Sequence, residues 1–185
     1  IFSWMPLTHD MGLIGFHLAP LANNMNQYIL DTQLFIRSPY LWFEKISKYR
    51  IGVTASPNFG YSFYLNHVKE DRRKSLDLSC VRLIFSGAEP ISQEVVDEFT
   101  QIMSKYGLKK NTMYPVYGLA EASLAVTFPH PGEKVRVLAV NRFNLKLGDK
   151  IDISKNKTKD DNIIVSLGRP LNGETIKIID NNGTE

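Results

Sequence analysis

The sequence has a single cysteine, Cys80, so no disulfide can form within the chain. No apolar run approaches the ~18 residues that a helix needs to cross a bilayer. The formal net charge is only +3, with acidic and basic residues interspersed, which gives no support for nucleic-acid binding. These scarcities argue against a disulfide-stapled secreted domain, a membrane span and a nucleic-acid partner, and they favour the reducing cytoplasm.

The residues that are present have an ordinary globular balance, with 43% hydrophobic and 22% charged residues in a chain of 185. Patterns typical of strands and helices alternate along its first two thirds. We expect strands at 28–30, 51–55, 81–85, 111–115 and 124–128, and helices at 11–21, 38–49, 58–68 and 92–106. This alternation predicts an α/β fold, a doubly wound and mostly parallel sheet with helices on both faces.

Capping residues mark several of these helix ends. Asp10 and Ser92 each stand at the start of a predicted helix and have side chains typical of an N-cap. Gly107 is typical of the residue that ends a helix. Ser38 and Pro39 predict a third helix start, with serine as the N-cap. The charged run 69–74 mixes acids with bases between apolar segments, and we interpret it as a solvated loop.

The pattern changes after residue 128. Residues 135–140 and 163–167 resemble strands with no long helix between them, and 155–161 predicts a polar loop. We therefore expect a central α/β subdomain at 1–128, then a linker and the start of a β-rich subdomain at 129–185. The chain begins at Ile1 without a methionine, and an Asn-Gly turn signal follows the apolar stretch 176–179. We expect an internal segment of a longer protein.

Three of the predicted strands end in loops of unusual composition, at 56–60, 86–90 and 116–121. Ligands of open parallel sheets bind beyond the carboxyl ends of the strands. Small residues in these loops allow close backbone approach, and each loop adds an aromatic side chain or a carboxylate. An aromatic face suits a purine, and a carboxylate suits magnesium phosphate.

Each feature also has a simpler interpretation. The 86–90 segment is also typical of a plain turn from strand to helix, and Glu121 is also placed to favour a helix N-terminus. Phe59 and Tyr61 fit core aromatics equally well. His9 and Asp10 stand together where a helix begins, which suits either a cap with an incidental histidine or a histidine beside an anionic reacting group.

Taken in order, the motifs resemble one family. Trp-Met-Pro-Leu-Thr-His-Asp-Met-Gly-Leu-Ile-Gly at 4–15, Ser-Gly-Ala-Glu-Pro at 86–90 and Tyr-Gly-Leu-Ala-Glu-Ala-Ser-Leu-Ala-Val at 117–126 are similar to the adenylate-forming superfamily. Within it, the His-Asp-Met-Gly-Leu, Gly-Ala-Glu-Pro and Tyr-Gly-Leu-Ala-Glu wordings look most like fatty acyl-AMP ligases. Residues 165–170 and 176–180 resemble the family's passage into its β-rich subdomain.

The resemblance implies an enzyme that joins a fatty or related carboxylic acid to ATP, with Mg²⁺, to give an acyl adenylate and pyrophosphate. The acyl group then passes to the phosphopantetheine thiol of an acyl carrier protein. His9 would lie beside the reacting groups, and Glu121 would hold the metal. The implied nucleotide-binding residues are Gly87, Ala88, Glu89, Pro90, Tyr117 (which would stack on the purine), Gly118, Leu119 and Ala120. The implied substrate-binding residues are Asp10, Phe59, Gly60 and Tyr61.

The same resemblance puts the family's phosphate loop before Ile1 and its catalytic lysine after Glu185. The segment is therefore expected to hold part of the ATP and acyl sites and to be inactive alone. Two alternatives stay open: an acyl-CoA synthetase, with coenzyme A as acceptor, and a nucleotide-binding or carrier-docking module without catalysis of its own.

Overall fold

The computed structural model describes residues 1–144, 151, 153–154 and 158–185. Its centre is a five-stranded sheet in the order β2-β1-β3-β4-β5, in which every neighbouring pair is parallel. The strands are β1 (Phe2–Ser3), β2 (Tyr28–Ile29), β3 (Val53–Ser56), β4 (Leu83–Ser86) and β5 (Met113–Pro115). The predicted parallel α/β sheet is confirmed.

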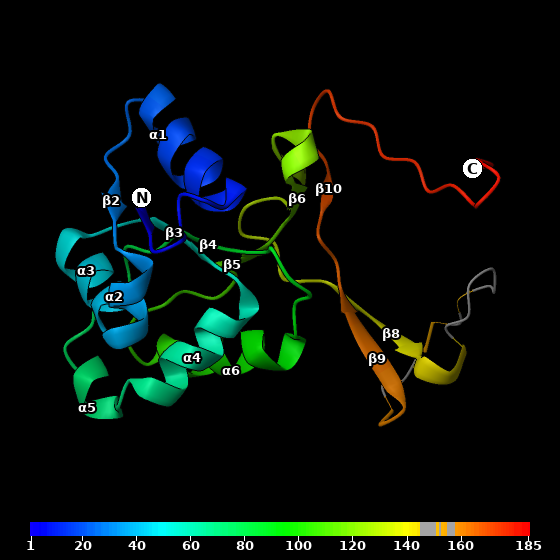
Figure 1. Ribbon diagram of the computed structural model, residues 1–185. Helices are drawn as coiled ribbons and strands as arrows, with labels where there is room; N and C mark the ends of the chain where they lie inside the picture. The colour runs from blue at the N-terminus through cyan, green and yellow to red at the C-terminus, as the bar shows by residue number, and fades with distance from the viewer. Residues whose placement is uncertain (145–150, 152, 155–157) are drawn as a thin grey trace.

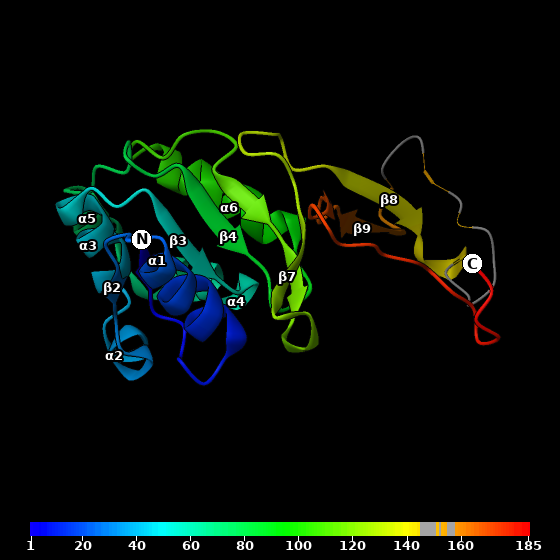
Figure 2. The ribbon, with the colours of Figure 1, turned by 90° about the horizontal axis from the view of Figure 1, so that it is seen from above.

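Helices cover both faces of this sheet (Figures 1 and 2). One face carries α3 (Leu41–Tyr49), α4 (Asn58–His67) and α6 (Gln93–Ser104). The other carries η1 (Met11–Leu18), which continues into α1 (Ala19–Ala22). The two short helices α2 (Thr32–Arg37) and α5 (Glu70–Arg73) complete the helical part.

The main core lies between the sheet and α3, α4 and α6. Its largest fully buried side chains include Trp42, Tyr64 and Phe99, which come from these three helices. Trp42 Nε1 donates a hydrogen bond of 2.9 Å to Thr54 Oγ1 on β3, so the indole is buried with its polar atom satisfied. Burial of these aromatics fixes the sheet on its helical layer.

Side chains of β4 alternate between the two faces, as a strand requires. Ile84 and Ser86 are fully buried on the helical side, whereas Leu83 and Phe85 are half-buried on the side of η1. The η1 layer therefore covers its face of the sheet less completely. This incomplete cover leaves room for a cleft.

Two smaller sheets follow. One joins β6 (Tyr117–Leu119), β7 (Leu124–Phe128) and β10 (Arg169–Pro170), with the 3₁₀ turn η2 (Ala120–Ala122) between the first two strands. The other is the antiparallel pair β8 (Val137–Asn141) and β9 (Asp161–Val165), which extends away from the main sheet; the 3₁₀ turn η3 (Arg142–Asn144) follows β8 (Figure 1). The boundary expected at 128/129 stays a prediction, and pairing of β7 with β10 ties the two sides of it together.

The predicted helix at 11–21 is confirmed, although its first part, η1, has π-type pairing and α1 is α-helical. Two other expected details of the helices were wrong. Ser38 does not cap a helix through its side chain: α3 begins at Leu41, whose N–H donates to the Ser38 carbonyl. The predicted loop at 69–74 contains α5, because the Arg73 side chain is buried and donates to the carbonyls of Leu65 and Val68.

The other expectations had mixed outcomes. The caps by Asp10 and Ser92 are confirmed, since both side chains accept hydrogen bonds from the first turns of their helices. The apolar stretch 176–179 forms no strand, although a turn follows it, in which Gly183 N donates to Asp180 O. Part of the predicted polar loop, 155–157, lies outside the described residues.

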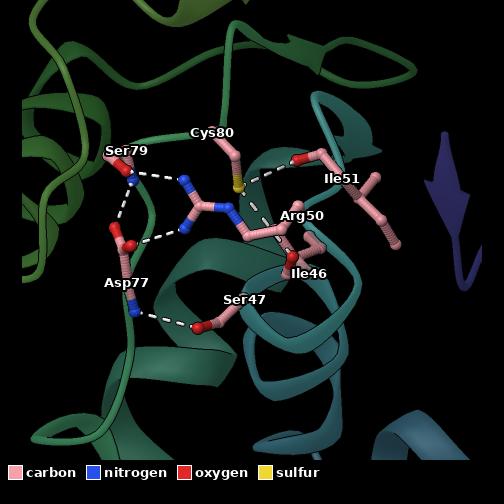
Figure 3. Close-up of polar contacts among 7 residues, drawn as sticks. All are labelled: Ile46, Ser47, Arg50, Ile51, Asp77, Ser79 and Cys80. Atoms are coloured by element: carbon pink, nitrogen blue, oxygen red, sulfur yellow. Dashed lines mark hydrogen bonds and ion pairs between the residues drawn. The ribbon is translucent and has the colours of Figure 1, made fainter.

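A polar network fixes the end of α3 to the segment before β4 (Figure 3). Arg50 ends the helix in a left-handed conformation, and its guanidinium binds the Asp77 carboxylate and donates to Ser79 Oγ at 3.0 Å. Asp77 N in turn donates to Ser47 Oγ at 2.9 Å. Cys80 is half-buried beside this network, with Sγ 3.5 Å from the Ile51 carbonyl oxygen. Its placement agrees with a structural rather than a reactive thiol.

Candidate functional site

The loops singled out by sequence meet at one edge of the sheet. Ser56 of β3 is level with Ser86 of β4, which is level with Pro115 of β5, so the three strands end side by side. The carboxylate of Glu89, in the loop after β4, accepts a 2.6 Å hydrogen bond from Phe59 N, in the first turn of α4, which follows β3. The β1 strand is parallel to β3, so the segment that carries His9 also leaves the sheet at this edge. The three loops and the His9 segment therefore converge at one edge of the sheet.

Two clefts open at this edge. The first, of about 820 Å³, lies between η1 and the sheet. Its lining is mainly apolar but includes His9 and Asp10. The second, of about 530 Å³, lies between the loop after β4 and β9. Four residues line both clefts: Ala88, Val116, Tyr117 and Gly118. The clefts are therefore neighbouring compartments that share one wall.

His9 and Asp10 enter the first cleft from the start of η1. His9 Nδ1 is 2.7 Å from Asp10 Oδ1, and Met11 N donates to the same oxygen at 2.8 Å. The carboxylate can accept both bonds if Nδ1 carries the proton, and this tautomer leaves Nε2 free. Met11 N also lies 3.2 Å from Nδ1, but a protonated Nδ1 cannot accept. Asp10 therefore caps the helix and orients a half-exposed histidine at the cleft.

Tyr117, the first residue of β6, has a side chain that is 45% exposed. Its backbone pairs with β7, and a bulge lies between Tyr117 and Gly118. A Cβ at Gly118 would lie 1.8 Å from the carbonyl oxygen of Leu124, so only glycine permits this tight hairpin. The hairpin thereby presents the ring of Tyr117 to the wall between the clefts.

The floor of the first cleft is aromatic and aliphatic. Phe85 packs edge-on against Phe16 of η1 at 5.8 Å between ring centroids and against Phe128 of β7 at 5.6 Å. All three rings line the cleft, together with Val53 and Leu83 from the sheet. Such a surface suits an apolar chain rather than a charged ligand.

Most of the expected site residues lie at these clefts. Those lining the first cleft are His9, Asp10, Ala88, Tyr117, Gly118, Leu119 and Ala120. Those lining the second are Ala88, Glu89, Pro90, Tyr117 and Gly118. Five expected residues line neither: Phe59, Gly60, Tyr61, Gly87 and Glu121.

These five have different surroundings. Tyr61 is fully buried and donates to the carbonyls of Ser56 and Phe85, and burial raises the pKa of its phenol above the ordinary value. Gly60 is buried against Trp4, Gly87 is buried against Val116, and Phe59 is half exposed at the start of α4. Glu121 is exposed on η2 beside Ala120, which does line the first cleft.

Sequence reasoning missed the wall that η1 and β7 build. Ile14, Gly15 and Phe16 of η1 face Leu124 and Ala125 of β7 across the first cleft. The apolar helical spacing after Met11 was a usable signal, but nothing local shows that this face meets β7. The β9 residues that line the second cleft, Ile163, Ile164 and Val165, were likewise not expected there.

A metal site would depend on ligands from a bound nucleotide. In the described ranges, no group of three or more His, Cys, Asp or Glu side chains is placed to hold a metal ion. Mg²⁺ that travels with ATP takes most of its oxygens from phosphates and water and needs only one or two carboxylates. The exposed carboxylate of Glu121 fits the role of such a single protein ligand.

No helix within the described residues is long and apolar enough to cross a membrane.

Comparison with known proteins agrees with this geometry. The chain matches the AMP-binding enzyme family over residues 1–185. It is 34% identical over 178 residues to the medium-chain-fatty-acid–[acyl-carrier-protein] ligase JamA of Moorena producens, covering 96% of this chain and 30% of that protein. The chain belongs to the AMP-binding enzyme family, and the relatives that it resembles are named as acyl-carrier-protein and fatty acyl-AMP ligases.

Solved structures extend the likeness to three dimensions. A structure from a study of fatty acyl-adenylate ligases of E. coli and L. pneumophila superposes with a TM-score of 0.94 at 37% identity, covering 99% of this chain and 33% of that one. The L. pneumophila ligase in complex with acyl adenylate and pyrophosphate gives 0.90 at 34% identity, covering 97% and 31%. The chain spans about 30% of the length of the curated relatives that it matches.

Proposed function

We propose that this chain forms the acyl cleft and part of the nucleotide site of a fatty acyl-AMP ligase. The observation that carries the proposal is the shared wall of the two clefts, at Ala88, Val116, Tyr117 and Gly118. An apolar chain in the first cleft and an adenine in the second would bring the acyl carboxylate and the α-phosphate together at this wall. Adenylate formation requires that juxtaposition.

The reaction is a displacement at phosphorus. A carboxylate oxygen of the acid attacks the α-phosphorus of ATP, the bond to the bridging oxygen breaks, and pyrophosphate leaves with the electron pair. Two anions must approach each other, so the protein contributes positioning and charge neutralisation rather than a nucleophile of its own. The acid is held by the apolar cleft, and its carboxylate end lies toward His9.

Specific residues take the remaining parts. Tyr117 stacks on the purine, and Ala88, Glu89 and Pro90 border it. His9 Nε2, left free by the bond from Nδ1 to Asp10, donates to the reacting anions when the ring is protonated. Glu121 would hold Mg²⁺ through its exposed carboxylate, and the ion would supply positive charge to the phosphates.

In the second half-reaction a thiol sulfur attacks the acyl carbonyl, a thioester forms, and AMP leaves. We propose that the thiol is the phosphopantetheine of an acyl carrier protein, in line with the name of the Moorena producens relative. We also propose that the protein works in the cytoplasm, because the single free cysteine suits a reducing compartment.

The test measures ATP–pyrophosphate exchange by the full-length protein with decanoate and dodecanoate. Exchange that depends on the acid supports the proposal, and its absence with every fatty acid tested contradicts it. Acyl transfer to a phosphopantetheinylated carrier, compared with transfer to coenzyme A, then separates the ligase from an acyl-CoA synthetase. Binding of ATP without exchange would favour the non-catalytic module.

A variant pair ties the activity to the shared wall. Tyr117→Ala removes the stacking ring and should raise the KM for ATP about tenfold, because base–aromatic stacking is worth about 1–3 kcal/mol. Tyr117→Phe keeps the ring and should stay close to the wild type. Tyr49→Ala is the matched control, since Tyr49 is 43% exposed, nearly as much as Tyr117, and lines neither cleft.

A further inference from the structure

The second cleft runs along one edge of strand β9. Ile163, Ile164 and Val165 all line it, although neighbouring side chains of a strand point to opposite faces. Three consecutive residues border the same cleft where it follows the edge of the strand, at which the backbone is accessible. None of the residues of β8, all of which the structure describes, lines this cleft. The cleft therefore lies on the edge of β9 that does not pair with β8.

The hydrogen bonds at the two ends of the β8–β9 pair show which backbone groups lie on that edge. In an antiparallel pair, every second pair of opposite residues exchanges ladder bonds, and the residues in between direct N–H and C=O outward. Ser166 N donates to Arg136 O at one end, and Arg142 N donates to Asp160 O at the other. The register between these ends is regular, so both bonds belong to one alternation. The even-numbered residues of β9 face β8, and the odd-numbered residues face away.

Ile163 and Val165 are the odd-numbered residues of β9 that line the second cleft. The outer edge of β8 follows the same alternation, because the carbonyl of Ala139 accepts a bond there from Ser154 N. Among the described residues, no hydrogen bond engages the N–H or the C=O of Ile163 or Val165. Val165 is buried, and buried backbone groups without a partner are rare in folded proteins. A ligand in the cleft would satisfy them.

The chemistry of this edge suits a purine base. The carbonyl of Ile163 and the N–H of Val165 are neighbours along it, an acceptor followed by a donor. Adenine carries the complementary pair on one edge, since its 6-amino group donates and its N1 accepts. The phosphates of a nucleotide have only acceptors at neutral pH and could not pair with the carbonyl. Tyr117 lines the same cleft, so its ring can cover a face of the base.

We propose that the free edge of β9 recognises adenine: the Ile163 carbonyl accepts a hydrogen bond from the 6-amino group, and the Val165 N–H donates to N1. The inference rests on the proposed function, which assigns the second cleft to the base of ATP. It makes the β8–β9 pair, which extends away from the main sheet in Figure 1, part of the nucleotide site. Because both contacts come from the backbone, the identities of these side chains give no sign of them.

The first experiment removes each hydrogen-bonding group of the base in turn. Pyrophosphate exchange by the full-length protein is measured with a fatty acid and ATP, 1-deaza-ATP or purine riboside triphosphate. The first analogue has a C–H in place of N1, and the second lacks the 6-amino group. The kcat/KM of the wild type should be about tenfold higher for ATP than for either analogue, as expected when one hydrogen bond to a buried group is lost.

A proline variant assigns the N1 contact to Val165. Val165→Pro removes the N–H that faces the cleft and spares the ladder to β8, and proline is tolerated at a free strand edge. Its preference for ATP over 1-deaza-ATP should fall to about twofold or less, whereas its preference over purine riboside triphosphate should remain, because the Ile163 carbonyl is intact. Val137→Pro is the matched control: Val137 lies directly opposite on β8, its N–H faces the other edge, and it lines neither cleft.

A measurement on the wild type covers the case in which Val165→Pro fails to fold, as judged by its melting curve. Amide hydrogen exchange is followed at single residues of the full-length protein with and without ATP. The N–H of Val165 should exchange at least about tenfold more slowly when ATP is bound, because a hydrogen-bonded amide is protected. The N–H of Val137 should exchange at the same rate in both samples.

The outcomes separate this inference from the function beneath it. If exchange of pyrophosphate depends on a fatty acid but ATP and 1-deaza-ATP are used alike, the inference is overturned and the proposed function stands. The same holds if a folded Val165→Pro keeps the preference for ATP over 1-deaza-ATP, or if ATP leaves the hydrogen exchange of Val165 unchanged. If the wild type exchanges pyrophosphate with no fatty acid, both are overturned. Loss of the preference in Val165→Pro but not in Val137→Pro supports the inference.

Discussion

Glu89 and Phe59 lie thirty residues apart in the sequence and are joined by one hydrogen bond, from the backbone N–H of Phe59 to Glu89 Oε1 at 2.6 Å. The donor belongs to the first turn of α4, whose N-cap, Pro57, offers no side-chain acceptor. The carboxylate therefore satisfies an otherwise free helix N–H and carries negative charge to the positive end of the helix dipole. It also connects the loop after β4 to the start of α4.

Glu89→Ala should remove this cap and the connection between the loops. We expect a loss of about 1 kcal/mol in the free energy of unfolding, as for other N-terminal caps. Glu89→Gln keeps an oxygen acceptor and should lose less. Because Glu89 also lines the second cleft, the KM for ATP should rise in the alanine variant more than in the glutamine variant. Urea unfolding and ATP titration check both effects, and equal behaviour of the two variants would contradict the capping role.

Tyr61→Phe should destabilise the fold and leave substrate preference unchanged. The lost hydroxyl donates to two buried carbonyls, those of Ser56 and Phe85, so we expect a cost of about 1–3 kcal/mol. Since Tyr61 lines neither cleft, the order of preference among fatty acids should stay the same. A changed order would restore the sequence-based expectation that Tyr61 borders the acyl chain. Tyr49→Phe, at an exposed tyrosine, is the control.

Asp77 should contribute to stability in a pH-dependent way. Hydrogen bonds from Ser79, and then from Arg50, lower the pKa of its carboxyl group from 3.8 to about 2 in the folded state. A depressed folded pKa means that the stabilisation is fully present above about pH 4 and is lost as the pH falls from there toward 2. Asp77→Asn should therefore be less stable than the wild type at neutral pH, with the difference shrinking below pH 4. Melting temperatures across this range are the measurement, and a constant difference would count against the network in Figure 3.

Glu121→Gln tests the proposed metal ligand. The substitution keeps the shape of the side chain but removes its charge, and a neutral amide is a poorer ligand for Mg²⁺. Adenylation should slow, and added magnesium should recover part of the rate. If Glu121 merely favours the start of η2, the change should cost at most about 1 kcal/mol of stability and leave the rate intact. Rate against magnesium concentration, with a melting curve beside it, distinguishes the two roles.

Local sequence was enough to predict the parallel sheet and the edge at which the site lies. Strand patterns ending near Ser56, Ser86 and Pro115 are local properties, and parallel strands put their carboxyl ends at one edge. The motif loops that follow them therefore had to meet. The caps at Asp10 and Ser92 were equally local, because a cap acts within one helical turn.

Tertiary packing decided the rest. The direction of the Tyr61 side chain depended on which face of α4 met the sheet. The helix at 70–73 depended on burial of Arg73, which donates to the carbonyls of Leu65 and Val68, although the charged residues around it predicted a solvated loop. The first cleft is lined by η1 and β7, two segments that lie more than a hundred residues apart in the sequence. Periodicity can identify an apolar face, but only the folded chain determines which surface that face meets and how much space remains between them.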